Sequence, residues 1–444
     1  MSRLIKENTG ITIVKMALPM LAGTFAINMY NLTNVWFVSR LGTDSLAAIS
    51  FAFPVVMLLT FIIRGIGTGV MSLTAGLIGA KDTANTSKLV IHSMIFAVIT
   101  ALLMTLAGIL TAKMLFAKLG ASGNTLSLAL EYMNIWYLGS VIMVVHMILG
   151  DIIMSTGNTR AISALMVGGT VVNIFFDLGL IFGKFGMPAL GIKGAAIATI
   201  ISQSFTLTGA LFILFVRLKI IVPIVLRLNE IRESWLKIIK FAVPSSLGMI
   251  MTPVSAAVIT KLVAGYGDEA VAAAGVAGRI EMFAFMIPMT VGMSLIPFVA
   301  QNYGAGRTDR IKEARVITMS FAAIYGLFIA ALFFIFSRPM AVLFSSDPNV
   351  INVLVLYIKI TCAGYGMLEI HRYAGFCLLG MQAPVQASVL DIVRIVILLI
   401  PLSIIGEKLF HLNGIFTGRL LTDLAAGAVG IIWSGMVIKR KESK

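Results

Sequence analysis

The chain has 444 residues, of which 59% are hydrophobic and 12% are charged, whereas a soluble domain carries about 25% charged residues. Its mean hydropathy is +1.00, so the lipid bilayer is the solvent for most of the chain, and a soluble protein with a polar surface is excluded. The formal net charge of +15 does not indicate a nucleic-acid partner, because basic residues flank membrane helices and fix their orientation.

Long apolar runs recur from one end of the chain to the other. Breaking the chain at glycines, prolines and charge clusters gives twelve segments, each able to supply the roughly 20 apolar residues that cross a bilayer. Their approximate centres are Ala26, Leu59, Ala101, Val141, Thr170, Ser204, Met251, Pro288, Ile324, Gly366, Val396 and Asp423. The first run begins near Ile11 and is too long for a signal-peptide core, so we expect it to be retained as a helix. The sequence predicts an all-α polytopic membrane protein with twelve transmembrane helices.

The first span carries a stripe of amides. Asn28, Asn31 and Asn34 follow one another at intervals of three residues, which keeps them near one face of a helix. Lipid offers an amide no hydrogen-bond partner, so we expect the stripe to face the polar interior of the N-terminal bundle. Pro19 removes a backbone hydrogen bond and is predicted to kink the same span, which makes this span the one expected to move.

The fifth span contains an isolated acid. Asp177 lies in the stretch VVNIFFDLGLIFG with no basic residue within six positions, and Asn173 lies four residues before it, on the same helical face. A carboxylate that is isolated in a low-dielectric environment becomes easier to protonate, and its oxygens with that of Asn173 would also suit a hard cation. The pair is therefore predicted to act as an ion switch; the alternative is a protonated, inert aspartic acid.

One polar break, residues 217–237, separates two halves that repeat each other. The stretch IVKMALP ends at Pro19 and IIKFAVP ends at Pro244, an offset of 225 residues. The same offset relates Gly42 to Gly267, Ala47-Ala48 to Ala272-Ala273, Gly79 to Gly304, Tyr132 to Tyr357, Gly139 to Gly364 and Gly150 to Gly375. Each half holds six spans, an even number, so the repeat is parallel and its pseudo-two-fold axis lies along the membrane normal. Two six-helix bundles of this kind enclose a cleft, which is an architecture for alternating access.

The expected division of the chain follows from this repeat. An N-terminal bundle is predicted at residues 1–216, a cytoplasmic or interfacial linker at residues 217–237, and a C-terminal bundle at residues 238–444. The Lys and Arg residues outside the spans number twenty on the side that holds both termini and eight on the other. Both termini are therefore predicted to be cytoplasmic.

The second half places several charges inside the spans, where each costs at least about 2.5–3.5 kcal/mol unless it is paired or hydrated. Helical spacing predicts three local ion pairs, which are Glu369 with Arg372, Asp391 with Arg394, and Arg419 with Asp423. Glu281 follows Arg279 by two residues, so their side chains point apart and Glu281 is a better functional candidate than the paired acids. The histidines His146 and His371 are more typical of satisfied core residues than of a proton relay.

Several stretches resemble the MATE (multidrug and toxic compound extrusion) transporters of the MOP flippase superfamily. They are MALPML and YNLTNVWFVSRLG in span 1, LAAIS in span 2, VVNIFFDLGLIFG in span 5 and GIKGAAIATIISQ in span 6, followed by AVAAAGVAGRIEMFAFMIPMTVG and FVAQNYGAGR in and after span 8. The resemblance covers nearly the whole chain and looks closest to the prokaryotic DinF-like branch.

This resemblance implies a cation site in the N-terminal half. In the related transporters the site uses an acid near the end of span 1, an Asn and an Asp in span 5, and a Thr in span 6. The matching residues here are Asn173 and Asp177 in span 5 and, more loosely, Thr199 in span 6. The span 1 acid stands in a YNLxD pattern, and this chain has Asn34 at that position. A relay between two carboxylates is therefore not expected, and Asp177 remains as the one titratable group among neutral ligands.

The resemblance also implies the activity: a secondary active antiporter of the cell (inner) membrane that exports organic cations or amphipathic drugs and takes up H+ or Na+. We expect a monomer with no cofactor, no metal other than Na+ at Asp177, and no enzymatic activity. Residues expected to line the substrate cavity are Asn28, Asn31, Gln203, Arg279, Glu281 and Glu369. The alternative is a flippase for lipids or lipid-linked oligosaccharides, which would need Arg64, Arg279, Lys359 and Arg372 to converge on the cleft without acidic partners. An intramembrane enzyme built on Asp151 and Asp177 is disfavoured because no catalytic motif accompanies either residue.

Overall fold

The computed structural model describes residues 3–222 and 225–442, and nearly all of these residues are helical. The first half of the chain forms α1 (Arg3–Lys6), α2 (Thr9–Ser39), α3 (Thr43–Gly79), α4 (Thr83–Lys118), α5 (Gly123–Leu138), α6 (Ser140–Ser155), α7 (Thr159–Phe182) and α8 (Ile192–Phe212), which continues as the π-helical segment η1 (Ile213–Arg217). The second half forms α9 (Leu228–Ala264), α10 (Asp268–Ala284), α11 (Met286–Gly304), α12 (Thr308–Phe344), α13 (Pro348–Thr361), the 3-10 turn η2 (Cys362–Gly364), α14 (Tyr365–Gly380), α15 (Pro384–Ile392), the π-helical segment η3 (Val393–Leu399) and α16 (Ile400–Glu442).

These helices account for the twelve predicted spans. In the described part of the chain, nine helical runs are long and apolar enough to cross a membrane, or up to eleven if the bent pairs α5–α6 (53°) and α10–α11 (54°) each count as one span. The last run, Pro384–Glu442, is counted once although its backbone is not helical at Phe410 and His411. The chain reverses there, because Asp423, beyond the break, accepts a hydrogen bond from Arg394 of η3 at 2.7 Å, and Gly418 packs against Leu402 and Ser403. This reversal supplies the twelfth span and confirms the predicted all-α polytopic fold.

The helices form two compact units, which we call the N-terminal unit (Lys15–Val243) and the C-terminal unit (Arg3–Val14 with Pro244–Lys444). The division differs from the expected one at both ends. Residues 3–14 belong to the C-terminal unit, and the linker, with the beginning of α9, belongs to the N-terminal unit. The two helices that open the halves, α2 and α9, are therefore each divided between the units shortly before or at their prolines, Pro19 and Pro244.

Polar contacts explain why residues 3–14 belong to the C-terminal unit. The buried Arg310 side chain on α12 donates to the carbonyl oxygen of Leu4 at 3.3 Å and to the amide oxygen of Asn302 at 3.0 Å. The Asn302 amide in turn donates to the same Leu4 carbonyl at 3.1 Å. At this end of the unit the end of α16 is held as well, through a 2.7 Å ion pair between Lys312 and Glu442.

A corresponding set of contacts holds the linker to the N-terminal unit. The Ser87 hydroxyl on α4 donates to the carbonyl of Val222 at 3.0 Å, and the Trp235 indole on α9 donates to the carbonyl of His92 at 3.0 Å. Lys88 pairs with Glu230 at 2.7 Å. The segment that precedes each half therefore belongs to the unit of the other half. Residues 3–14 belong to the C-terminal unit, and the linker belongs to the N-terminal unit.

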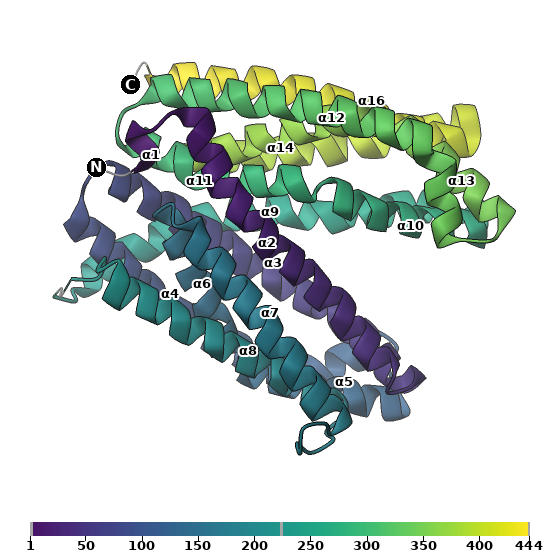
Figure 1. Cartoon of the computed structure of the whole chain (residues 1–444), viewed down its shortest axis with the longest axis horizontal. Helices are drawn as coiled ribbons and strands as arrows, with labels where there is room; N and C mark the ends of the chain where they lie inside the picture. The colour runs from purple at the N-terminus through teal and green to yellow at the C-terminus, as the bar shows by residue number, and fades with distance from the viewer. Residues whose placement is uncertain (1–2, 223–224, 443–444) are drawn as a thin grey trace. The chain divides into compact units, whose positions relative to one another are not determined.

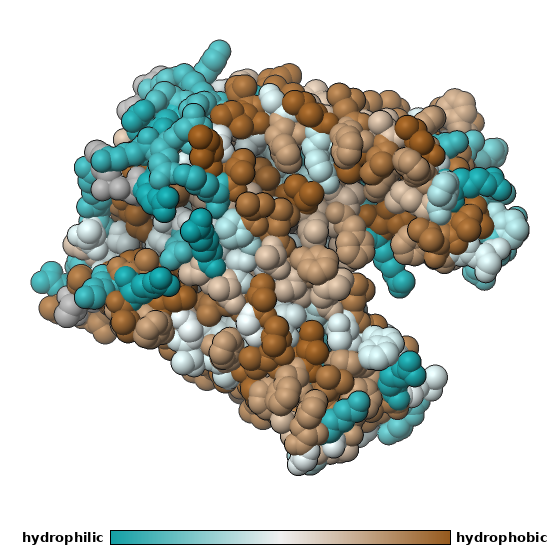
Figure 2. Space-filling view, in the orientation of Figure 1, coloured by the Kyte–Doolittle hydropathy of each residue, from teal (hydrophilic) through white to brown (hydrophobic). Residues whose placement is uncertain are grey.

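Each unit has its own apolar core. In the N-terminal unit α7 packs along α8, and α6 packs against α3, α4 and α8. In the C-terminal unit α14 packs against α12, α16 and α11, and Figure 1 shows it alongside α12. Large apolar side chains remain exposed along the middle of α12, including Ile324, Leu327 and Phe328, and Figure 2 shows this apolar stretch with hydrophilic residues at its two ends. That pattern is the one a bilayer selects for a spanning helix.

Backbone geometry confirms the parallel repeat. Gly42 and Gly267, related by the offset of 225, precede α3 and α10 with φ values of 104° and 101°. This region of φ is open to glycine and strained for other residues, so both turns require it. The bend after α5 at Gly139 also has its counterpart, since the 3-10 turn η2 ends at Gly364. The bend between α10 and α11 has none, because the equivalent stretch of α3 is continuous.

Candidate functional site

The candidate site of the N-terminal unit begins on α7. Asn158 caps this helix by accepting a hydrogen bond from the backbone N–H of Ala161 at 3.2 Å, and Gly183 ends it with a φ of 72°. Between these ends the apolar residues face outward or into the packing with α8. Asn173 is 2% exposed and Asp177 is 0% exposed. One helical turn separates them, so the amide and the carboxylate lie together inside the unit.

Helices α2 and α8 bring polar groups to the same place. The Thr199 hydroxyl donates to the carbonyl of Ala195 at 3.0 Å, so its oxygen is left to accept from the Tyr30 hydroxyl, 3.3 Å away. The Asn34 side chain and the Asp177 carboxylate both lie near the Tyr30 hydroxyl. Asp177, Asn34 and Thr199, predicted from three different spans, thus belong to one cluster around Tyr30.

Tyr132 of α5 completes this cluster. Its hydroxyl lies within electrostatic range of both Tyr30 and Asp177, and its ring packs against the apolar residues around Phe37 and Ile181. Phenol hydroxyls can donate to a carboxylate or accept from a protonated one. The site therefore contains one acid, two amides, two phenols and one threonine hydroxyl.

The acid and its neighbouring amide have unused hydrogen-bonding capacity. Both carboxylate oxygens of Asp177 and both polar side-chain atoms of Asn173 are buried, and none has a hydrogen-bond partner within residues 3–222 and 225–442. A buried polar group without a partner costs about 1–3 kcal/mol, and more for a charged one. Four such atoms within one helical turn form a site that a proton or an oxygen-coordinated cation would satisfy.

The other polar candidates of this unit lie further from Asp177 or at its edge. Asn31 is exposed on the unit and Asn28 is partly exposed, so of the three asparagines only Asn34 is in contact with the Tyr30 cluster. Gln203 follows Thr199 by one turn of α8, and its amide oxygen is buried with no partner in the described part of the chain. Gln203 therefore extends the polar lining of the unit beyond Thr199.

Asp151, the other acid of this unit, lies in different surroundings. Its carboxylate packs against Gly67 of α3, where an added Cβ atom would come within 1.9 Å of an Asp151 oxygen. The charged group near it is Arg64, whereas the groups near Asp177 are the two tyrosines. The two acids do not share a cluster, which removes the geometric basis for an intramembrane enzyme built on both.

The acidic site of the C-terminal unit differs in one chemical respect: its carboxylate is fully hydrogen-bonded. Glu281 on α10 accepts from the hydroxyls of Tyr357 at 2.9 Å and Tyr365 at 3.0 Å. The Arg419 guanidinium pairs with the other carboxylate oxygen at 2.9 Å. Glu281 was expected to be a functional acid because it lacked a local partner, but a cation from α16 already neutralises it.

Two of the three predicted local ion pairs involve Glu369 and Arg419. Glu369, 1% exposed, pairs with Arg372, as the three-residue spacing predicted. Arg419 lies 4.0 Å from Asp423 but only 2.9 Å from Glu281. Its main partner is therefore the glutamate of another helix.

The third predicted pair, Asp391 with Arg394, is wrong. Arg394 donates to Asp423 at 2.7 Å, across the reversal of the last two spans. Asp391 instead contacts the Nε2 atom of His371 at 3.1 Å. Helical spacing identified residues that could meet on one helix, but tertiary packing offered partners with better geometry.

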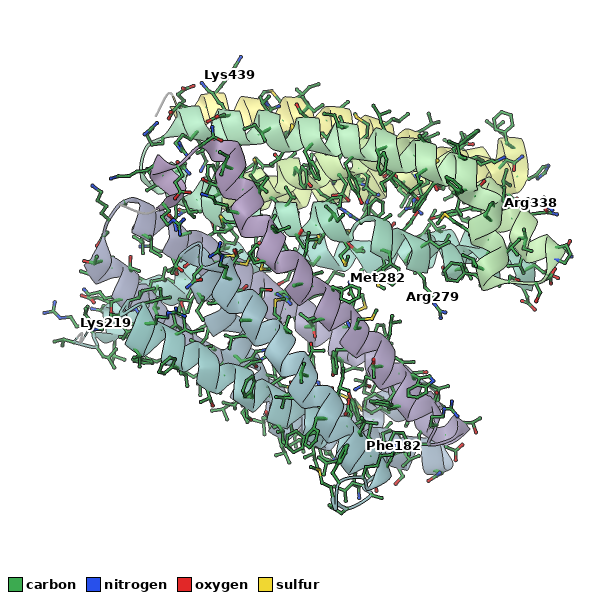
Figure 3. The ribbon with its side chains drawn as sticks, viewed as in Figure 1. Phe182, Lys219, Arg279, Met282, Arg338 and Lys439 are labelled. Carbon is green, nitrogen blue, oxygen red and sulfur yellow. The ribbon has the colours of Figure 1, made fainter. Side chains whose placement is uncertain are left out.

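Among the described residues, the intramembrane cations do not gather in one place within either unit. Arg372 is paired with Glu369, and Lys359 lies 5.3 Å from the centre of the Phe334 ring. Arg279 is exposed and points, with Met282, away from the rest of its unit (Figure 3). The convergence of basic side chains that the flippase alternative requires is thus not seen in the C-terminal unit, where Arg279 and Lys359 have no acidic partner in the ranges described.

The tyrosines of the two sites were not predicted from the sequence as site residues. Tyr132 and Tyr357 entered only as one pair of the repeat, yet Tyr132 lies near Asp177 and Tyr357 donates to Glu281. Tyr30 precedes Asn34 by four residues and could have been placed on the same helical face. Tyr365 carried no such signal, because it lies 84 positions from Glu281 in the sequence and meets it only in the folded unit.

Comparison with known proteins agrees with the repeat and the fold. The MatE family model matches the chain twice, at residues 19–178 and 244–405, and the starts of the two matches differ by the offset of 225. The FAD transporter of Shewanella oneidensis is 31% identical over 424 residues, which are 96% of this chain and 94% of that protein. Multidrug export protein MepA of Staphylococcus aureus is 28% identical over 415 residues, which are 92% of this chain and 89% of that protein.

Solved structures share the arrangement of helices. The Vibrio cholerae MATE transporter VcmN in its bent form has a TM-score of 0.93 at 25% identity, and the match covers 98% of both chains. A multidrug resistance MATE family transporter in an outward-facing conformation has a TM-score of 0.92 at 24% identity and covers 100% of this chain and 98% of its own. The second likeness concerns the fold alone.

Proposed function

Because the chain belongs to the MATE family of membrane transporters, we propose that it is a secondary active antiporter of the cell membrane. It exports amphipathic organic molecules by alternating access, and H+ or Na+ enters in exchange. It acts as a monomer whose termini both lie in the cytoplasm, as the distribution of Lys and Arg predicts.

The observation that supports this coupling best is the contrast between two buried acids. The carboxylate of Asp177 has no hydrogen-bond partner in the part of the chain that the structure describes, whereas Glu281 accepts two phenol hydroxyls and pairs with Arg419. A coupling ion must bind and then dissociate. The Glu281 carboxylate is already paired with the Arg419 guanidinium and cannot bind another cation in the same place. Coupling is therefore assigned to Asp177 and the N-terminal unit.

The switch follows from the position of Tyr30 and Asn34 on α2. When Asp177 is charged, it attracts the hydroxyl and amide hydrogens of the surrounding side chains. A proton or Na+ from outside cancels that attraction, and Tyr30 then keeps only its contacts with Thr199 and Asn34. Reversing a 1:99 population of two conformations requires about 5.5 kcal/mol. Neutralising one buried carboxylate, whose burial costs several kcal/mol, supplies most of that difference.

Asn34 sets the chemistry of this switch. It stands where the resemblance places an acid, and an amide carries no charge, so one ionisable group serves where related transporters have two. Amide, hydroxyl and carboxylate oxygens together suit Na+, and the carboxylate alone suits a proton. Both ions satisfy the unpartnered atoms of Asp177 and Asn173.

Two classes of substrate are proposed, from the names of two related transporters and from the exposed charge of Arg279. The relationship to a multidrug export protein favours amphipathic organic cations. The relationship to an FAD transporter favours an anion that carries phosphate, and the exposed Arg279 provides the matching charge on the C-terminal unit. A guanidinium binds phosphate oxygens with two parallel hydrogen bonds, so the phosphate-bearing anion is the second candidate.

Exchange in proteoliposomes tests the proposal. Ethidium and FAD, one fluorescent cation and one fluorescent anion, are each loaded and their exit is followed under an imposed proton or sodium gradient. We expect gradient-driven exit of at least one of them in the wild type and its loss in Asp177→Asn. Asp151→Asn is the matched control, since it removes an acid of the same unit outside the Tyr30 cluster. Exit from Asp177→Asn at the wild-type rate under both gradients would overturn the proposal.

A further inference from the structure

The two units hold their proline-containing helices α2 and α9 in the same way. In the N-terminal unit the Ser163 hydroxyl of α7 donates to the carbonyl oxygen of Pro19 on α2. In the C-terminal unit the Ser388 hydroxyl of α15 donates to the carbonyl oxygen of Pro244 on α9. Both serines and both prolines are related by the offset of 225, and both bonds join residues 144 positions apart.

A glycine one turn after each proline lets the helices approach. A Cβ atom added at Gly23 would lie 2.8 Å from the sulfur of Met166 and 3.3 Å from the Cα atom of Ser163. A Cβ atom added at Gly248 would lie 2.8 Å from an oxygen of Asp391 and 3.7 Å from the Cα atom of Ser388.

These glycines and their neighbours are again 225 residues apart, as Met166 and Asp391 are. The register of the repeat therefore extends to residue 391, beyond the last pair that the sequence alone revealed. We call each set of proline, serine and glycine a clasp.

The clasps stand where the two units divide the chain. Residues 9–14 of α2 belong to the C-terminal unit and Lys15–Ser39 to the N-terminal unit, while α9 passes from one unit to the other between Val243 and Pro244. In each helix a proline that cannot donate a backbone hydrogen bond follows the crossing within a few residues. A helix is weakest where a rung of its hydrogen-bond ladder is missing, so bending is expected there.

From these observations we propose that Ser163 and Ser388 are positioning residues that anchor α2 and α9, at their prolines, to the fifth span of each half. Each clasp fixes the point about which the following part of the helix bends. The inference rests on the proposed function insofar as alternating access requires the two units to move, but the clasps themselves act within each unit.

The two clasps differ in the number of carbonyl oxygens that can accept the hydrogen of the serine hydroxyl. For Ser163 the Pro19 carbonyl is the one acceptor recorded within the described ranges. The Ser388 hydroxyl lies 3.0 Å from a second acceptor, the carbonyl of Pro384 on its own helix. Since a hydroxyl has one hydrogen to donate, the bond to Pro244 competes with a local one. Loss of Ser163 is therefore expected to change its helix more than loss of Ser388.

Distances between spin labels within the N-terminal unit test this inference without any substrate. Cys362 and Cys377 are replaced by alanine, and labels are attached at the exposed positions Leu32 on α2 and Phe175 on α7. Ser163→Val removes the hydroxyl. Ser163→Thr retains it, and its side chain has nearly the same volume as that of valine. One net hydrogen bond corresponds to about a fivefold change in the ratio of two states. We expect Ser163→Val to shift the ratio of α2 conformations by about this factor and Ser163→Thr to preserve the wild-type distribution.

Two controls make the outcome specific. Ser93→Ala removes another buried hydroxyl, whose one recorded acceptor in the described ranges is the Leu89 carbonyl of its own helix at 2.6 Å. Ser388→Ala disrupts the other clasp, and neither change should alter the Leu32–Phe175 distance. The inference is overturned if Ser163→Val gives the wild-type distribution, or if Ser93→Ala shifts it as much. Because no transported molecule is involved, these results do not depend on whether the proposed antiport is correct.

Discussion

Removing the guanidinium from the C-terminal acidic site should destabilise the protein without uncoupling it. Arg419→Met leaves the Glu281 carboxylate with two tyrosine hydroxyls and no counter-charge. The two side chains are only 16% and 12% exposed and meet at 2.9 Å. At such burial, loss of one partner of an ion pair costs about 3–5 kcal/mol, mostly because the remaining charge is left buried.

A double variant separates charge from packing. In Glu281→Gln/Arg419→Met the amide oxygen can still accept from Tyr357 and Tyr365, and no isolated charge remains. We expect the double variant to recover most of the lost free energy of unfolding, since a buried ion pair replaced by neutral groups is often close to neutral in effect. Equilibrium unfolding in detergent with increasing dodecyl sulfate gives the free energy of unfolding. It is measured for the wild type, Glu281→Gln, Arg419→Met and the double variant, which together form a double-mutant cycle.

Transport by the double variant completes the test. If Glu281 is structural, gradient-driven exit persists in the double variant at a rate near that of the wild type. A double variant as stable as the wild type but unable to couple transport to an ion gradient would refute the reasoning, because it would place the coupling charge in the C-terminal unit.

Three further predictions concern single side chains. Asn34→Asp restores an acid to the Tyr30 cluster, and we expect transport to be retained with a shifted pH profile, measured as exit rate against pH; an unchanged profile would separate Asn34 from the switch. Arg279→Ala should slow FAD exit at least severalfold and leave ethidium exit unchanged, and equal effects on both would remove the anion candidate. Asp82→Ala removes the N-cap that accepts from the backbone N–H of Asn85 at 3.0 Å, at a cost of about 1 kcal/mol of stability. Since hydrogen bonds from Asn85 lower the pKa of Asp82, this stabilisation is present at neutral pH and is lost as the pH falls through that lowered pKa, so unfolding of wild type and variant should converge in acid.

The spans and the repeat were predictable because the bilayer imposes them on the sequence. Runs of apolar residues long enough to cross, interrupted by Gly, Pro and charge, leave few alternative helices. Pro19 and Pro244 lie at one offset because each occupies the same place in the helix that opens its half. The assignment of residues 3–14 to the C-terminal unit and of residues 217–243 to the N-terminal unit could not be predicted. It depends on tertiary contacts such as those of Arg310 with Leu4 and of Trp235 with His92.

The candidate site was predictable where it lies on one helix. Asn173 and Asp177 share a face of α7, and four-residue spacing is visible in any sequence. Tyr30 and Tyr132 come from other helices, so only packing brings them to the acid. The same limit explains the error over Asp391 and Arg394: a long arginine side chain reaches across a helix interface to Asp423, and spacing along one helix cannot report that choice.

The central claim is that Asp177 is the group that binds the coupling ion. The most direct measurement follows ion movement itself: liposomes holding the protein and a pH-sensitive or sodium-sensitive dye are given an outward gradient of whichever of ethidium or FAD the wild type transports. We predict that the wild type moves one of the two ions inward as the organic molecule leaves, and that Asp177→Asn moves neither while Asp151→Asn behaves as the wild type. Inward ion movement through Asp177→Asn at the wild-type rate would contradict the assignment.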